Sequence, residues 1–154
     1  MLSGVPRALP ALHRAQRVQA KASRVGFDWS RTDEVMAKVE EELAELKEAI
    51  ASGDAAAVRE EAGDLLFSIV NLCRFRKIHA EDALDMTVRK FRRRFEAVER
   101  RVAAAGRKMT DCSLAELDGL WNAVKAAEKR GRRKRAVKAP PGSGRGGRRP
   151  RGKR

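Results

Sequence analysis

Apolar side chains recur every three or four residues through most of the chain, and short polar breaks divide this pattern into segments. Such spacing is typical of amphipathic helices, and no run of alternating β-branched residues points to a strand. The breaks contain glycine, serine or aspartate, which begin and end helices. Five helices are expected, at about residues 10–24, 31–52, 55–76 and 80–105, with a short one after Ser113. The fold class is therefore predicted to be all-α, a helical bundle with short connections.

The segment expected to form the third helix contains LLFSIVNLC, which is apolar on nearly every side of the helix. Phe67 and Ile69 project in roughly opposite directions at about 100° per residue. A helix with water along one side would not show this pattern. We therefore expect one face to pack within the domain and the other against a second subunit. A homodimer is predicted, and further pairing into a tetramer is left open.

The net charge of +14 comes almost entirely from the C-terminal segment. Residues 128–154 carry 13 Lys or Arg and one acid, whereas residues 1–127 are nearly neutral. We therefore expect a single domain at 1–127 and a basic, disordered tail at 128–154. The tail could contact nucleic acid non-specifically through phosphates, or it could be a solvated appendage with no specific role.

The rest of the composition argues against several classes of protein. The longest nearly apolar run, from Leu65 to Cys73, is about half the length of a membrane span. The N-terminal residues lack the features of a secretion signal. Cys73 and Cys112 belong to no CxxC pair, which argues against a disulfide framework or a zinc module. We expect a cytoplasmic protein without membrane association.

Acidic residues flank the turn expected at Gly53. Glu45 and Glu61 lie eight residues before and after this glycine. Glu42 and Asp64 lie eleven residues before and after it. In an antiparallel helix hairpin with a tight turn, residues at equal distances from the turn reach equal height. The four carboxylates are therefore expected to meet across one groove.

Clustered carboxylates repel one another, and partial burial makes their ionisation less favourable still. A bound divalent cation would remove this conflict. Ligation by oxygen suits Mg²⁺, with Mn²⁺ as an alternative, and Mg²⁺ takes further ligands from water and substrate phosphates. Acidic pairs at helical spacing are often only a solvated face. Two matched pairs beside the core nevertheless favour a metal site on the antiparallel hairpin.

A basic pair lies on the segment expected to form the fourth helix. Lys90 and Arg94 are four residues apart, and each precedes a phenylalanine of the apolar seam. They could hold the outer phosphates of a polyphosphate, Arg94 by forked hydrogen bonds and Lys90 as a point charge. The alternative is that both cover apolar surface or pair with acids.

Taken together, these motifs resemble the MazG family of nucleoside triphosphate pyrophosphohydrolases, within the all-α NTP pyrophosphatase superfamily. The superfamily pattern EExxE followed by ExxD is matched by Glu41, Glu42, Glu45, Glu61 and Asp64. The motif GFDW and the run KFRRRF add to the likeness, which extends from Val5 to Lys125. Longer members carry two such domains in tandem, and one set of motifs is found here.

The resemblance implies an enzyme that hydrolyses a nucleoside triphosphate between the α and β phosphorus atoms. The products would be a monophosphate and pyrophosphate, and the cofactor Mg²⁺. The implied role is nucleotide-pool housecleaning with broad tolerance of the base. Lys90 and Arg94 would bind phosphate. The implied metal ligands are Glu42, Glu45, Glu61 and Asp64.

Four further residues have more than one interpretation. Glu41 could contribute to water activation or to metal binding. Asn71 could hydrogen-bond the sugar or base, or it could be a buried amide satisfied by backbone. Trp29 and Trp121 could stack on the nucleobase, or they could be core residues.

A function from a different class competes with the hydrolase. In this alternative the chain is a helical interaction protein that binds nucleic acid through its Arg-rich tail, and the acids form a solvated or subunit-facing surface. Deleting residues 128–154 distinguishes the two. The enzyme should keep its activity, whereas a tail-driven binder should lose its affinity and its steep salt dependence.

Overall fold

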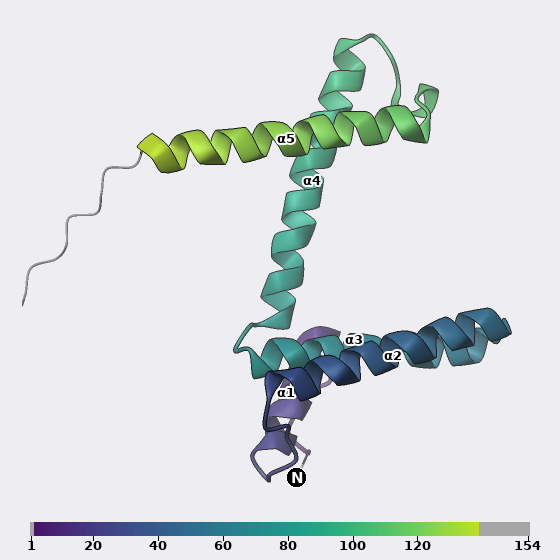
Figure 1. Ribbon diagram of the computed structural model, residues 1–154, viewed down its shortest axis with the longest axis vertical. Coiled ribbons are helices and arrows are strands. Elements are labelled where there is room, and N and C mark those ends of the chain that lie inside the picture. The colour runs from purple at the N-terminus through teal and green to yellow at the C-terminus, as the bar shows by residue number, and fades with distance from the viewer. Residues whose placement is uncertain (1, 139–154) are drawn as a thin grey trace, which may run out of the picture. The chain divides into compact units, whose positions relative to one another are not determined.

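The computed structural model describes residues 2–138, which form helices and connecting turns without a strand (Figure 1). The elements are α1 (Ala11–Ser23), α2 (Thr32–Ser52), α3 (Ala55–Phe75), α4 (Ala80–Ala104), the 3₁₀ helix η1 (Met109–Asp111) and α5 (Leu114–Lys138). The prediction of an all-α fold is confirmed for this part of the chain. Two compact units are present, one ending at Lys90 and the other beginning at Phe91.

Helix α5 is longer than the sequence pattern indicated. It runs to Lys138, so residues 128–138 are helical although they were expected to belong to the disordered tail. Lys and Arg are good helix formers, and a solvated helix needs no apolar face to continue. The remainder of the expected tail, 139–154, lies outside the described residues, and the domain boundary at 127 stays a prediction.

The first unit is organised around the antiparallel pair of α2 and α3, which pack along their length (Figure 1). The turn between them contains Gly53, whose φ of 76° lies in the left-handed region that favours glycine. Asp54 then caps α3, because its Oδ1 accepts hydrogen bonds from the backbone N–H groups of Ala56 at 2.8 Å and Ala57 at 3.3 Å. Both the turn and the cap were predicted from the sequence.

Helix α1 completes the first unit by packing on α3. Its Gln16 side chain donates to the carbonyl of Ile78 at 2.8 Å and accepts from the N–H of Ala80 at 2.9 Å. These two bonds tie α1 to the turn before α4 and to the first residue of that helix. Val35 of α2 and Val70 of α3 are the most completely buried side chains of this unit.

The second unit has its own small core where the C-terminal half of α4 meets α5. The buried members are Val98, Val102 and Val124, and Leu117, Leu120 and Trp121 are among the residues packed against them. Glu116 and Ser113 cap α5 reciprocally: Glu116 accepts from the Ser113 N–H at 2.7 Å, and Ser113 Oγ accepts from the Glu116 N–H at 3.3 Å. This is the capping box expected from the sequence.

The apolar seam predicted along α4 is packed only in part. Val98 and Val102 are buried, whereas Leu84 and Val88 remain about half exposed. On α3, Phe67 and Ile69 are likewise exposed, at 45% and 41%. Such apolar surface is compatible with a second subunit, and the homodimer stays a prediction. Among the described residues, no helix combines the length and apolarity needed to cross a membrane.

Candidate metal centre

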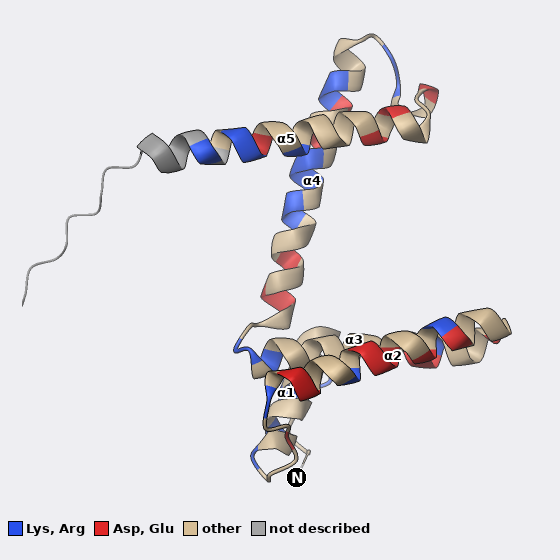
Figure 2. Ribbon diagram, in the orientation of Figure 1, with Lys and Arg blue, Asp and Glu red and all other residues tan. Residues whose placement is uncertain are grey.

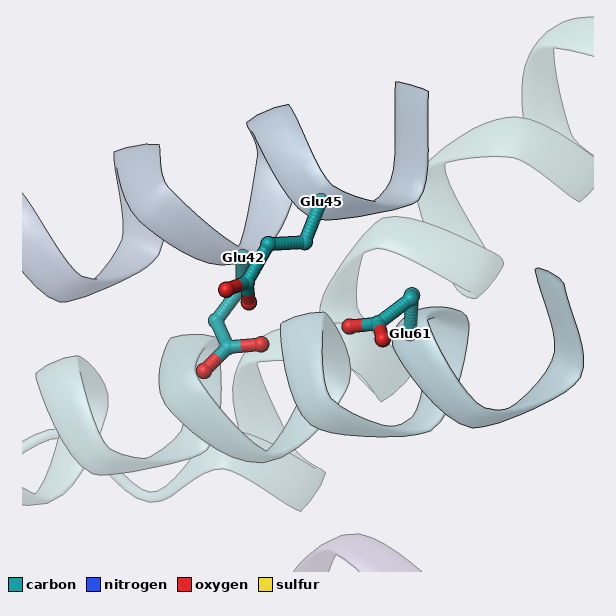
Figure 3. A group of neighbouring side chains, drawn as sticks. All are labelled: Glu42, Glu45 and Glu61. Atoms are coloured by element: carbon teal, nitrogen blue, oxygen red, sulfur yellow. The ribbon is translucent and has the colours of Figure 1, made fainter. Parts of the chain in front are cut away.

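Three carboxylates converge on the inner side of the α2–α3 hairpin. Glu42 and Glu45 come from α2 and Glu61 comes from α3, and each offers one oxygen within 4.8 Å of the other two. Figure 3 shows the side chains of the two α2 residues and that of Glu61 directed into the space between the two helices. The cluster therefore combines both halves of the EExxE and ExxD pattern.

Helix geometry explains why these residues meet. Glu42 and Glu45 are three apart on α2, so they share one face. Glu45 and Glu61 lie eight residues from Gly53 on opposite sides, which places them at similar height in the hairpin. Glu42 is only 6% exposed, Glu61 is half-buried and Glu45 is exposed. The cluster is therefore buried between the helices at Glu42 and exposed to solvent at Glu45.

The electrostatics of the cluster suit a cation. Partial burial raises the pKa of Glu61 above its ordinary value, and the negative charges of Glu45 and Asp64 raise it further. An ionised Glu61 is therefore unfavourable next to its neighbours. A divalent cation with a preference for oxygen ligands would reverse that effect, so the donor set fits Mg²⁺ or Mn²⁺.

Asp64, the fourth ligand predicted from the sequence, is placed differently. It is exposed on α3, and its carboxylate is not one of the three that meet within 4.8 Å. It remains close enough to Glu61 to raise the pKa of that group, and it lines the same cavity as Glu42. The structure therefore groups three of the four predicted ligands and leaves Asp64 at their border.

A lysine that the sequence reasoning did not single out lies beside the cluster. The Nζ of Lys38 is 2.7 Å from Glu42 and 2.8 Å from Glu41. The hydrogen bonds that Lys38 donates to Glu41 and Glu42 raise the pKa of Lys38 above its usual range. Glu41 is exposed and directed to this lysine. The sequence did contain a signal for this contact. Lys38 precedes Glu41 by three residues and Glu42 by four, and this spacing places all three side chains on one face of the helix.

A mainly apolar cavity of about 360 Å³ adjoins the acids in the first unit. Glu42 and Asp64 line it, as do Trp29 and Asn71, the two residues of this unit that were considered for sugar or base contacts. Asn71 is buried, and its Oδ1 accepts a hydrogen bond from Arg74 Nε at 2.9 Å. Its amide is thus held by a side chain and not by the backbone.

Arg74 also fixes the segment before α2. Its Nη1 donates to Asp28 at 2.9 Å, and this hydrogen bond is the main reason that the pKa of Asp28 is lowered. Asp28 belongs to the GFDW motif, so the ion pair anchors the chain next to Trp29. Both Arg74 and Trp29 border the cavity, which explains how this segment forms part of its wall.

Comparison with known proteins places this hairpin in a family. Residues 31–99 match the family model described as the MazG nucleotide pyrophosphohydrolase domain. The matched range contains all of α2 and α3 and therefore every acid of the cluster. The chain carries a MazG domain.

Two relatives show how far the similarity extends. The nucleoside triphosphate pyrophosphohydrolase of Escherichia coli K12 is 45% identical over 131 residues, which are 82% of this chain and 49% of that protein. The nucleoside triphosphate pyrophosphohydrolase/pyrophosphatase MazG of Thermotoga maritima is 44% identical over 120 residues, 78% of this chain and 46% of that protein. The chain spans about half the length of these curated relatives.

The basic pair predicted from the sequence also falls within the MazG match. Figure 2 shows acidic residues along α2 and a run of basic residues in α4. Lys90 is half-buried at the end of the first unit. Arg94 belongs to the second unit, where its Nε donates to Glu128 at 2.8 Å and its guanidinium lies 5.9 Å from the ring centre of Trp121.

Trp121 packs within the second unit and not in the cavity of the first. Its ring centre is 5.2 Å from that of Phe91, and it borders the core formed by Val98, Val102 and Val124. Glu128 accepts a second hydrogen bond from Arg93, and the two arginines, Arg94 first, lower the pKa of Glu128. The binding of Glu128 by Arg93 and Arg94 was not predicted. The sequence suggested that Arg94 could pair with an acid, but it did not indicate which one.

Proposed function

We propose that this protein hydrolyses nucleoside triphosphates to the corresponding monophosphate and pyrophosphate with the help of Mg²⁺. The observation that carries the proposal is the convergence of Glu42, Glu45 and Glu61 to within 4.8 Å beside a cavity of nucleoside size. Two of the similar proteins, those of Escherichia coli and Thermotoga maritima, are named nucleoside triphosphate pyrophosphohydrolases, which supports the same reaction.

The residues divide between the metal and the phosphates. Glu42, Glu45 and Glu61 would hold the cation, with Asp64 at the border of the same site. When bound, the cation supplies neutralisation of charge on the phosphate oxygens and orientation of water. Lys90 and Arg94 would contact the outer phosphates, and Arg94 retains its two terminal nitrogens for this purpose because Glu128 is bound through Nε.

The proposed function includes a role in the cell and a homodimeric assembly. Broad tolerance of the base and a housecleaning role in the nucleotide pool are what the MazG resemblance implies for a chain of this kind. A homodimer would cover the exposed apolar residues of α3, which include Leu66, Phe67 and Ile69.

Product analysis tests the reaction. The full chain is incubated with each common nucleoside triphosphate in Mg²⁺ or in EDTA, and the products are separated by ion exchange. Monophosphate plus pyrophosphate is expected only with the metal. Glu42→Gln and Glu45→Gln should each abolish turnover, whereas Glu48→Gln, an exposed acid on the same helix, should not. Release of diphosphate and phosphate, or full activity of the cluster variants, would refute the proposal.

A further inference from the structure

The cavity beside the acidic cluster has the character of a site for a flat, largely apolar group. It measures about 360 Å³ and is formed by residues of α1, α2, α3 and the segment before α2, together with Leu2 near the N-terminus. Its apolar walls include Val18, Phe27, Trp29, Val35 and Phe67. Glu42 and Asp64 also line it, so a ligand with phosphates near the acids could place an aromatic ring among these side chains.

Gln19 of α1 is a buried polar residue in this apolar wall. It is 7% exposed, and its Nε2 donates to the backbone carbonyl of Phe67 at 2.8 Å. Because a carbonyl can only accept, this bond fixes which end of the amide is which. The Oε1 atom is then buried without a hydrogen-bond partner among the described residues. A buried acceptor of this kind is destabilising and therefore uncommon unless a ligand or a water supplies the donor.

Asn71 of α3 supplies the complementary group. It is 6% exposed, and its Oδ1 accepts from Arg74 Nε at 2.9 Å. Its Nδ2 is therefore oriented as a donor. Gln19 and Asn71 both line the cavity, so it has an oriented acceptor residue on α1 and an oriented donor residue on α3. The Oε1 atom of Gln19 is covered by its neighbours, so a ligand donor reaches it only when these atoms shift. Proteins that read nucleobases combine such groups with aromatic and apolar side chains.

We propose that Gln19 reads the base of the substrate: its side-chain carbonyl accepts a hydrogen bond from an N–H group of a nucleobase held in this cavity. The inference rests on the proposed function, because it takes the ligand to be a nucleoside triphosphate. Adenine and cytosine offer an exocyclic amino group, and guanine and uracil offer a ring N–H. Gln19 therefore accepts all four common bases and discriminates against bases whose N–H is missing or blocked.

Paired substrates test this role. Each common triphosphate is compared with an analogue that lacks the relevant N–H. The analogues are the triphosphates of purine riboside, of pyrimidin-2-one riboside and of 3-methyluridine. Inosine triphosphate, which has a ring N–H and no amino group, is compared with 1-methylinosine triphosphate in place of the guanine pair. The wild-type chain should favour the natural member by roughly tenfold or more in kcat/KM, since a buried polar group left unpaired penalises the analogue. Gln19→Met should reduce this preference to about twofold or less by lowering kcat/KM for the natural member alone.

Ser68→Ala is the matched control. Ser68 lines the same cavity, but its hydroxyl donates within its own helix to the carbonyl of Leu65 at 2.9 Å. The preference for natural bases should survive this change. Gln19→Leu provides a second variant if Gln19→Met does not fold. A wild-type chain without any preference, or a Gln19 variant that lowers both members of every pair equally, overturns the inference.

Calorimetric binding of the matching nucleoside monophosphates to the full chain separates this inference from the proposed function. If the natural monophosphates bind more tightly and no triphosphate is hydrolysed, the proposed reaction is wrong and the role of Gln19 stands. If triphosphates are hydrolysed but neither assay shows a preference within the pairs, the reaction stands and the role of Gln19 is overturned. This second result is also expected if a water molecule, and not the base, donates the hydrogen bond to Gln19.

Discussion

The ammonium group of Lys38 lies 2.7 Å from a carboxylate oxygen of Glu42, the most deeply buried acid of the cluster. The same group contacts Glu41 at 2.8 Å. The hairpin therefore carries a positive charge of its own beside the residues that would hold a metal. This charge offsets part of the repulsion among the acids. It also repels a metal ion that approaches the same carboxylates.

Lys38→Met should separate these two effects. Without the ammonium group, the metal-free protein should lose about 0.3–0.5 kcal/mol in its free energy of unfolding, the usual range for ion pairs at this helical spacing. Binding of Mg²⁺ or Mn²⁺ in the absence of nucleotide should become tighter, because repulsion by Lys38 is gone. Calorimetric titration and urea unfolding measure both quantities. Lys47→Met, an exposed lysine of the same helix, is the control, and weaker metal binding by Lys38→Met would contradict the argument.

Glu61→Gln should stabilise the metal-free protein and weaken the stabilisation that bound metal provides. Partial burial, and then the charges of the neighbouring acids, raise the pKa of Glu61, so its negative charge is unfavourable in the metal-free cluster. The neutral amide removes that repulsion and also a ligand. Thermal unfolding should show a higher Tm in EDTA than for the wild type and a smaller increase on addition of Mg²⁺. An unchanged Mg²⁺ effect would show that Glu61 does not belong to the metal site.

Asp54→Ala tests the turn that aligns the two acidic stretches. Asp54 satisfies the N–H groups of Ala56 and Ala57 at the start of α3, and loss of such a cap costs about 1 kcal/mol. Asp54→Ser keeps a capping oxygen and should recover most of the loss. Chemical unfolding followed by circular dichroism gives the comparison. Equal stability of all three proteins would show that this cap does not contribute.

The acidic cluster could be predicted from the sequence because every step of the reasoning was local. Helical spacing, one tight turn at Gly53 and equal distances along two helices are enough to bring Glu45 and Glu61 together. Gln19 could not be found in this way. Its partner, the carbonyl of Phe67, is 48 residues away and is chosen by the packing of α1 on α3. The only local signal was a glutamine at apolar spacing between Ala15 and Ala22.

The same limit explains the second unit. Arg94 was recognised as a candidate for phosphate binding, but its partner Glu128 lies 34 residues later, in a segment expected to be disordered. Composition indicated a solvated tail, and it could not show that α5 continues through that glutamate, where Arg93 and Arg94 bind it. The short-range pattern thus predicted the helices. The contacts between helices could be seen only in the three-dimensional structure.

Glu128→Ala should weaken binding of the triphosphate through Arg94. Glu128 holds the Nε of Arg94 at 2.8 Å and leaves the terminal nitrogens able to fork onto a phosphate. Loss of this orientation should raise KM roughly tenfold, equivalent to about 1.4 kcal/mol, with little change in kcat. Steady-state kinetics provide the test. Arg93→Met removes the other partner of Glu128 and should have less effect, and a lower KM for Glu128→Ala would mean that Glu128 competes with phosphate instead.

The pairing of Glu116 with Arg107 should make stability depend on pH in acid. A hydrogen bond from Arg107 at 2.8 Å, together with those from the backbone and hydroxyl of Ser113, lowers the pKa of Glu116 from 4.5 to about 2. The folded state therefore binds this proton less tightly than the unfolded state. The contribution to stability is present above about pH 4.5 and is lost progressively as the pH falls toward 2. Glu116→Gln should accordingly be less stable than the wild type at pH 7, and the difference should narrow between pH 5 and pH 3.5.

Urea unfolding at fixed ionic strength across this range measures the difference between the two proteins. Glu99→Gln, an exposed glutamate of α4, controls for the loss of one negative charge. Because the side chains of Arg107 and Glu116 are 43% and 47% exposed, added salt should reduce the difference at pH 7 as well. A difference that is constant from pH 7 to pH 3.5 would mean that ionisation of Glu116 does not contribute to the stability of the folded state.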